Sequence, residues 1–389
     1  MARNRDSRDM KNFIREAAFG RFRLRRQVIG GLMASAMAGA AGAPPVDAKT
    51  STPSSSITSG PLRIDVHAHY LPEAYRRAGL AAGIAKPDGM PAWPAWDPST
   101  ALATMDRLGV ASAVLSVSSP GVHFGDGAAA RSLARAVNES GAEVVALHPA
   151  RFGLFASLPL PDIDAALAEV GHALDTLHAD GVVLLTNYRG IYLGDPRFDA
   201  LFAELDRRQA VAFIHPTGPC PPTCSRPSGA GALEYPQPLI EFMFETTRAV
   251  THLVFSGTLD RYPRIQFIVP HAGAAVPVLS DRIAGMIPAL GLPNAPTPEH
   301  VSALLRGLYY DLAGYAVPKM LPSLLAVADT KRILYGSDWP FTPEAVVAKL
   351  SKLIDSTPIL DGETRSLILH ANAEALLPRL KMAASRADG

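Results

Sequence analysis

Two histidines close an early predicted β-strand, and their spacing suits metal binding. The run from Pro61 to His69 ends as Val66-His67-Ala68-His69. Because strand residues alternate between faces, His67 and His69 project side by side from the carboxyl end of the strand. Two adjacent imidazoles are suited to bind one divalent ion. A His-x-His pair alone is as typical of hydrogen-bonded or exposed histidines, so the interpretation depends on further ligands.

Three further residues of matching chemistry each follow an apolar run. His215 follows residues 211–214, His271 follows residues 267–270, and Asp338 follows residues 333–337. A single histidine or aspartate at such a place is more often structural or a polar surface residue. Three histidines and one aspartate are sufficient to hold one divalent ion and leave a position open for water or a substrate.

The elements that must position these residues alternate regularly along the chain. Eight apolar runs are predicted to be strands: Leu62–Val66, Ser112–Val117, Gly153–Leu158, Gly181–Leu185, Ala210–Ile214, Ile265–Val269, Leu308–Leu312 and Arg332–Tyr335. Amphipathic helical patterns lie between them, at Ala129–Val145, Asp162–Leu177, Phe198–Arg208 and Thr342–Ile354. Nearly continuous apolar strands indicate a parallel sheet covered by helices on the outside.

Eight such units predict an α/β fold, a (β/α)8 TIM barrel with a single metal site at its C-terminal rim. An open, doubly wound sheet is the structural alternative. It is disfavoured because the chain has neither a Gly-x-Gly-x-x-Gly after the first strand nor a phosphate-binding P-loop. In a barrel the chemistry lies where strands end, which is where all five residues fall.

Charge is unevenly distributed along the 389 residues, which are 48% hydrophobic and carry a formal net charge of +1. Residues 1–48 contain 9 of the 37 Lys and Arg but only 4 of the 36 Asp and Glu, so the rest of the chain is mildly acidic. No basic stripe is present, and nucleic acid is therefore not an expected partner.

The first 48 residues resemble a twin-arginine export signal. Arg25-Arg26 precede an uncharged run from Gln27 to Pro45, with small residues at Ala41-Gly42-Ala43. We therefore expect export or a periplasmic location, with a cytoplasmic location as the alternative if the leader is not a signal. The run is too short and too poor in Leu and Ile for a stable membrane span.

The remaining boundaries follow from composition. Residues 49–61 are Ser- and Thr-rich and are predicted to be a flexible linker, residues 62–380 the barrel, and residues 381–389 a C-terminal tail. Cys220 and Cys224 are close enough for a loop disulfide, and two free thiols are the alternative. We expect no catalytic role for either.

The motifs together resemble the metal-dependent amidohydrolase superfamily, in its ACMS-decarboxylase-like branch. The resemblance rests on Ile64-Asp65-Val66-His67-Ala68-His69, His215-Pro216, His271-Ala272-Gly273 and Tyr335-Gly336-Ser337-Asp338-Trp339-Pro340, in the order of the family. It spans roughly residues 62–380. The stretch from Leu185 to Pro196 and on to Thr217 is most similar to members of the 6-methylsalicylate decarboxylase type.

The resemblance implies a role for each motif residue. His67, His69, His215 and Asp338 would bind one metal ion, most often Zn²⁺ and alternatively Mn²⁺. His271 and Asp338 would act as the catalytic acid/base residues. Strand four ends in Thr186-Asn187 and has no lysine that could bridge two ions, so one metal is expected.

The resemblance also implies substrate contacts. Arg282 matches an arginine that reaches into a neighbouring subunit, which implies a homodimer. The family arginine after strand one is missing here, so either Arg76, Arg77 or Lys86 replaces it, or the substrate carries fewer carboxylates. Among the aromatic residues near the rim, Tyr188 and Trp339 are predicted to contact the substrate.

These residues predict a metal-dependent, non-oxidative decarboxylase (carboxy-lyase) of a small aromatic or conjugated acid similar to 6-methylsalicylate. The same ligands would serve a hydrolase of a lactone, ester or amide, which is the first alternative. A catalytically inactive binding barrel is the second.

Overall fold

The structure is a computed structural model that describes residues 62–219, 235–289 and 295–381. The predicted leader, the predicted linker, the pair Cys220 and Cys224, and residues 382–389 of the predicted tail lie outside the described residues. In the part of the chain that is described, no helix is long and apolar enough to cross a membrane.

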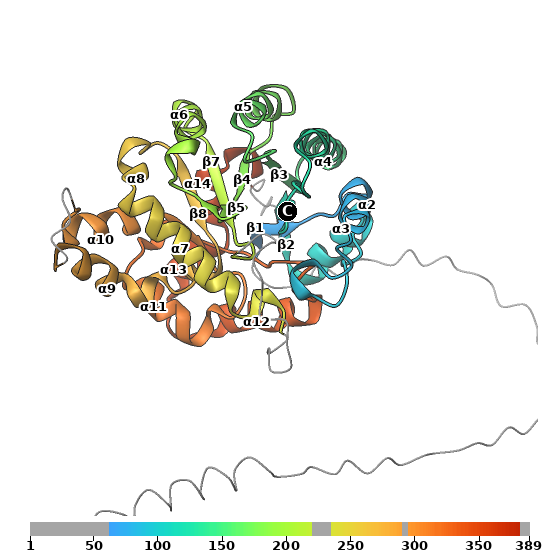
Figure 1. The fold of residues 1–389 in the computed structure, drawn as a ribbon. Coiled ribbons are helices and arrows are strands. Elements are labelled where there is room, and N and C mark those ends of the chain that lie inside the picture. The colour runs from blue at the N-terminus through green and yellow to red at the C-terminus, as the bar shows by residue number, and fades with distance from the viewer. Residues whose placement is uncertain (1–61, 220–234, 290–294, 382–389) are drawn as a thin grey trace, which may run out of the picture. The chain divides into compact units, whose positions relative to one another are not determined.

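Eight parallel strands form the barrel that the sequence predicts (Figure 1). Their order in the sheet is that of the chain: β1 Arg63–His69, β2 Val110–Ser116, β3 Phe152–Ser157, β4 Gly181–Leu185, β7 Val211–His215, β8 Gln266–Val269, β9 Tyr309–Asp311 and β10 Ile333–Leu334. The ring closes through backbone hydrogen bonds between β1 and the segment after β10, where Val66 N donates to Tyr335 O (3.1 Å) and Asp338 N donates to His67 O (2.7 Å).

Helices surround the strands in Figure 1. Their bounds are α2 Glu73–Ala81, α3 Pro98–Leu108, α4 Gly127–Leu147, α5 Ile163–Gly171, α6 Asp199–Arg207, α7 Glu241–Phe255, α8 Thr258–Arg261, α9 Val276–Ala289, α10 Pro298–Arg306, α11 Leu321–Leu325, α12 Glu344–Ser356, α13 Gly362–Ser366 and α14 Asn372–Leu376. Aspartate N-caps begin several of them; Asp126, for example, accepts a hydrogen bond from Ala129 N (2.6 Å) at the start of α4.

The two faces of the sheet bury separate apolar clusters. Side chains such as Val66, Val114 and Phe213 fill the barrel, and residues of α14 and Leu377 pack against them. A larger cluster lies between the strands and the outer helices. Because both faces of the sheet are buried, the strands are nearly continuous apolar runs in the sequence.

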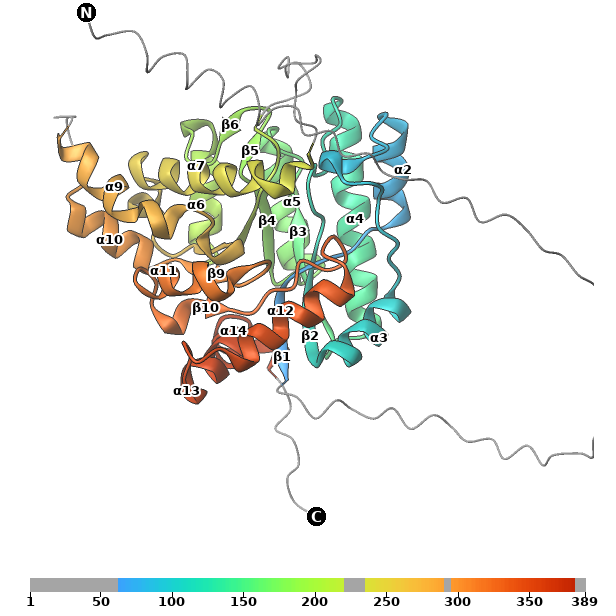
Figure 2. The ribbon, with the colours of Figure 1, turned by 90° about the horizontal axis from the view of Figure 1, so that it is seen from below.

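A short antiparallel hairpin extends the connection between β4 and α6. It consists of β5 Asn187–Tyr188 and β6 Ile191–Tyr192, joined by Arg189 and Gly190. Seen after a 90° turn in Figure 2, the hairpin lies at one end of the barrel and α13 lies at the other. The hairpin thus belongs to the C-terminal rim, where the candidate site lies.

Candidate metal and active site

Four side chains converge at the C-terminal rim. One potential ligand atom from each of His67, His69, His215 and Asp338 lies within 4.8 Å of the others. β1 contributes two of them, β7 contributes His215 as its last residue, and Asp338 follows β10. The three histidines are buried, and the Asp338 side chain is 21% exposed, so the cluster is closed below and open on one side.

An outer acceptor sets the orientation of the His67 ring. Its Nδ1 lies 2.9 Å from the Asp311 carboxylate at the end of β9. With the Nδ1 proton donated to that carboxylate, the Nε2 lone pair faces the cluster. Nε2 is buried and has no hydrogen-bond partner among the described residues, as expected of an atom that binds a metal.

The other two imidazoles have the same arrangement. His69 Nδ1 lies 3.0 Å from Ser116 Oγ and 3.2 Å from its carbonyl oxygen, and His215 Nδ1 lies 2.7 Å from Pro216 O. In each ring Nε2 is therefore left to point inward. Ordered outer acceptors of this kind are typical of metal-binding histidines.

The charge states of His69 and His215 fit this arrangement. Burial lowers the pKa of His67, but the Asp311 carboxylate outweighs it and raises this pKa to about 10, so a bound metal ion would take the place of the Nε2 proton. Burial lowers the pKa of His215 well below its usual value, and the nearby His69 and His67 lower it further, so this ring is held neutral. Burial alone would raise the pKa of Asp338, but the contacts from His271, His67 and His69 outweigh it and hold that pKa well below the usual range. Neutral imidazoles and one carboxylate are the donors that Zn²⁺ and Mn²⁺ bind, so the residues present fit a divalent ion.

His271 lies beside the cluster and is not one of its four donors. Its Nε2 is 3.9 Å from Asp338 Oδ2, and its backbone N donates to Asp311 Oδ1 (3.0 Å). Both His271 (φ 56°) and Asp338 (φ 59°) occupy the left-handed region, which is unfavourable for residues other than glycine. Such strain is maintained by the surrounding hydrogen bonds and is typical of active sites.

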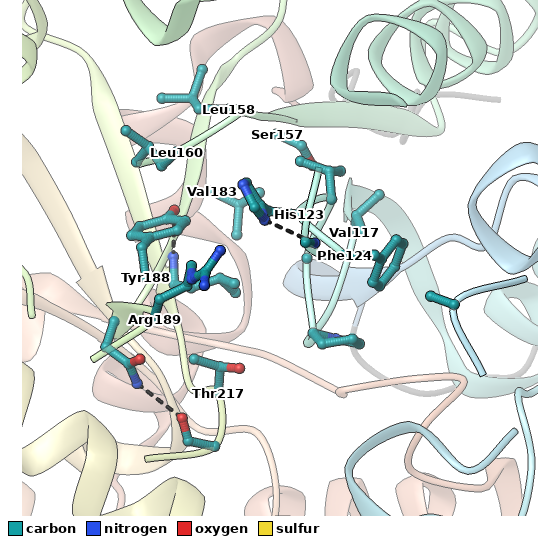
Figure 3. Close-up of a pocket in the computed structure, with 18 of the residues that line it drawn as sticks. Val117, His123, Phe124, Ser157, Leu158, Leu160, Val183, Tyr188, Arg189 and Thr217 are labelled. Atoms are coloured by element: carbon teal, nitrogen blue, oxygen red, sulfur yellow. Dashed lines mark hydrogen bonds between the residues drawn. The ribbon is translucent and has the colours of Figure 1, made fainter. Parts of the chain in front are cut away.

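Figure 3 shows a cavity of about 410 Å³, here called the rim cavity. It lies next to the cluster, since Leu185 in its wall pairs in register with His215. Its walls are the segment after α2, the loop after β2, the ends of β3 and β4 with the β5–β6 hairpin, and Thr217 and Gly218 after β7. Tyr188 lines it, and its hydroxyl accepts a hydrogen bond from Leu185 N (2.9 Å). Its contact with a substrate stays a prediction.

The other two predicted substrate contacts, Trp339 and Arg282, do not line the rim cavity. Trp339 borders a much smaller cavity between β1 and α3. Arg282 is exposed on α9 and has no hydrogen bond or ion pair with a described residue. Their roles in substrate binding stay predictions.

Three functional candidates were not singled out from the sequence. Asp311 could have been found, because it lies near the carboxyl end of a predicted strand, Leu308–Leu312, where the other candidates also lie. Arg189 lines the rim cavity, whereas Arg76, Arg77 and Lys86 do not. Asp65, whose Oδ1 accepts from His67 N and Ser337 N (3.0 Å each), joins β1 to the segment that carries Asp338. Burial raises the pKa of Asp65 to about 7.

A parallel eight-stranded barrel with one His/Asp cluster at its C-terminal rim defines the class of protein. The chain belongs to the amidohydrolase family, whose model matches residues 64–379. It is 38% identical over 336 residues to the 6-methylsalicylic acid decarboxylase acuB of Aspergillus aculeatus, covering 83% of this chain and 98% of that protein.

Solved structures agree with this assignment. The crystal structure of an amidohydrolase II superimposes with a TM-score of 0.76 at 35% identity and covers 81% of this chain and 99% of that one. A 5-carboxyvanillate decarboxylase of Novosphingobium aromaticivorans, complexed with manganese, has the same fold with a TM-score of 0.73 at 22% identity, covering 82% and 96% of the two chains.

Proposed function

We propose that the chain is a metal-dependent, non-oxidative decarboxylase of a small aromatic acid similar to 6-methylsalicylate. The observation that carries this proposal is the convergence of His67, His69, His215 and Asp338, with His271 beside them, at the open rim of the barrel. The similarity of the chain to a 6-methylsalicylic acid decarboxylase, which extends along the barrel, supports the choice of reaction.

The four donors would hold one divalent ion. When bound, such an ion supplies positive charge that binds the oxygens of the substrate and stabilises negative charge that develops in the reaction. The protein contributes the fixed ring orientations described above, and the buried histidines exclude water from beneath the ion. A manganese complex is known for a protein of this fold, and Zn²⁺ fits the same donors, so we propose Zn²⁺ with Mn²⁺ as the alternative.

Decarboxylation requires one proton at the ring carbon. The carboxylate leaves as carbon dioxide, the electron pair of the broken carbon–carbon bond stays with the ring carbon, and a proton takes the place of the carboxyl group. His271 and Asp338 are placed to deliver this proton, since they lie within 3.9 Å of each other on the open side of the cluster.

The proposal is tested by detecting carbon dioxide from 6-methylsalicylate and a panel of hydroxybenzoates, with metal-replete protein. Release should be lost in Asp338→Ala and retained in Asp260→Ala, an exposed aspartate that pairs with His300 on the outside of the barrel. Cleavage of lactones or esters, with no carbon dioxide from any acid, would instead establish the hydrolase.

We also propose that the chain forms a homodimer whose sites share Arg282. In support, Val278 and Met286, one turn to either side of Arg282 on α9, are 71% and 43% exposed, so this helix face is apolar around an exposed arginine.

Mixing two inactive variants tests the shared site. Arg282→Ala and Asp338→Ala should each be inactive alone. A mixture of the two should regain activity once subunits exchange, because the mixed dimer has one complete site. A monomer in light scattering contradicts the proposal.

The export proposal rests on the twin arginine and the small residues of the leader alone. N-terminal sequencing of the mature protein should show removal of residues 1–43 or 1–48. A mature protein that retains Met1 would contradict it.

A further inference from the structure

The rim cavity and the donor cluster share a boundary. Leu185 in the cavity wall pairs in register with His215, and Thr217 lies two residues beyond that ligand. On the facing loop, Ser118 Oγ is 3.3 Å from His215 Nε2, and the next residue, Ser119, bonds to the Thr217 hydroxyl (2.8 Å). A ligand held at the cluster is therefore flanked directly by the cavity.

The cavity is apolar over most of its wall. Val117 and Phe124 come from the loop after β2, Leu158 and Leu160 from the segment after β3, and Tyr188 from the hairpin (Figure 3). Arg189 is the one lining residue among those described that carries a permanent charge, and it is exposed to solvent. Such a wall favours an apolar occupant, since an unpaired charge buried there would be unfavourable.

The hairpin side of the cavity is held by a buried network. Asn187 Nδ2 donates to Gly218 O (3.0 Å) and to Glu245 Oε2 (3.2 Å), and Tyr192 OH donates to the same Glu245 oxygen (2.6 Å). The Glu245 side chain on α7 is 2% exposed. A wall with satisfied buried partners keeps its shape without a ligand, so the cavity is preorganised for its occupant.

The volume exceeds what a methyl substituent needs. About 410 Å³ lies within the range of roughly 300–1,000 Å³ that takes a drug-sized ligand. We propose that the rim cavity is a side pocket for an apolar ring substituent several carbons longer than methyl, so that the preferred substrates are salicylates with an alkyl chain at the 6-position. This inference rests on the proposed decarboxylase function and names its substrate class.

A chain-length series tests the side pocket. For 6-methyl-, 6-propyl- and 6-pentylsalicylate, kcat/KM should rise by up to about fourfold per added methylene, the factor for burying one such group, until the pocket is full. Turnover of the methyl compound with no gain for the longer chains overturns the side pocket and leaves the decarboxylase standing.

Two neighbouring alanines supply matched variants. Both Ala81 and Ala82 are exposed at the end of α2, but only Ala82 lines the cavity. Ala82→Trp should reduce the ratio of kcat/KM for the pentyl compound over the methyl compound, whereas Ala81→Trp should leave this ratio unchanged. Equal ratios in the two variants and in wild type would overturn the assignment to this cavity.

A binding measurement separates the two proposals. The 3-alkyl-2-nitrophenols, which carry a nitro group in place of the carboxylate of the 6-alkylsalicylates, cannot lose carbon dioxide. Their Kd, measured by calorimetry with metal-replete protein, should fall as the alkyl chain lengthens, and less so in Ala82→Trp. If that trend appears although no acid is turned over, the side pocket stands and the decarboxylase proposal fails.

Discussion

At the residue scale, the candidate site depends as much on the outer hydrogen bonds as on the four donors. His67, His69 and His215 each bond an outer acceptor through Nδ1, and each therefore presents Nε2 to the cluster. Asp311 is the one charged acceptor of the three. It also accepts from His271 N, so one carboxylate orients both a proposed metal ligand, His67, and the proposed acid/base residue His271.

Asp311→Asn should weaken metal binding by about 10- to 100-fold, the usual effect of losing such a partner. The amide keeps the size of the side chain but removes the charge that favours the Nδ1–H tautomer of His67. Competition with a chromophoric chelator measures the affinity. Asp329→Asn, at the start of a 3₁₀ turn on the outside of the barrel, is the control and should bind metal as wild type does.

Arg189→Gln should lower kcat/KM for acidic substrates by a few-fold at low salt, with an effect that disappears at high salt. The reason is that an exposed cation at the cavity mouth raises the local concentration of anions, and added salt screens it. Arg197→Gln is the control, because this arginine lies on the same β4–α6 connection but is paired with Asp195. An equal loss in both variants would mean a general effect of net charge.

At the element scale, the β5–β6 hairpin is bonded to two other parts of the rim. The Asn187 side chain donates to Gly218 O beyond β7 and to Glu245 on α7. Its Oδ1 accepts a hydrogen bond from Gly190 N in the turn of the hairpin (3.0 Å). The hairpin carries Tyr188 and Arg189, so its position determines the shape of the cavity.

Asn187→Ala should destabilise the protein by about 1–3 kcal/mol, since it leaves buried groups without partners. It should also raise KM, because the cavity wall is no longer held in place. Urea unfolding and steady-state kinetics measure the two effects. Tyr192→Phe removes a single hydrogen bond from the same network and should raise KM less. A stability change in Asn187→Ala as small as that of a surface substitution would show that the network does not hold the hairpin.

The strands and the donor cluster were predictable from the sequence, whereas the hairpin was not. All eight apolar runs are strands, because burial on both faces makes each run distinctive. The hairpin has two residues per strand and an Arg-Gly turn, with Arg189 at φ 57°, where Asn or Asp before Gly is the usual signal. The cavity walls come from five separate segments, and no local pattern reveals how such segments pack together.

At the scale of the whole molecule, the donor cluster joins the two ends of the barrel sequence. β1 and the segment after β10 meet at the closure, where Ala68 pairs with Trp339 and Asp338 N donates to His67 O. We call this closure between β1 and the segment after β10 the seam. An ion held by His67 and His69 on one side and by Asp338 on the other would link residues about 270 positions apart across it. Unfolding must break that link, so metal binding should stabilise the entire barrel.

Removing the metal should therefore lower the melting temperature as well as abolish activity. An ion present at 100 times its Kd contributes about 2.7 kcal/mol to the free energy of unfolding, and the contribution grows with its concentration. Scanning calorimetry of chelator-treated protein, titrated with Zn²⁺ or Mn²⁺, should show Tm rising with added metal. In Asp338→Asn, which loses the one carboxylate of the cluster and with it the donor beyond β10, the rise should be much smaller. If this variant gained as much stability from metal as wild type does, the ion would bind elsewhere, and the cluster at the seam would not be the metal site.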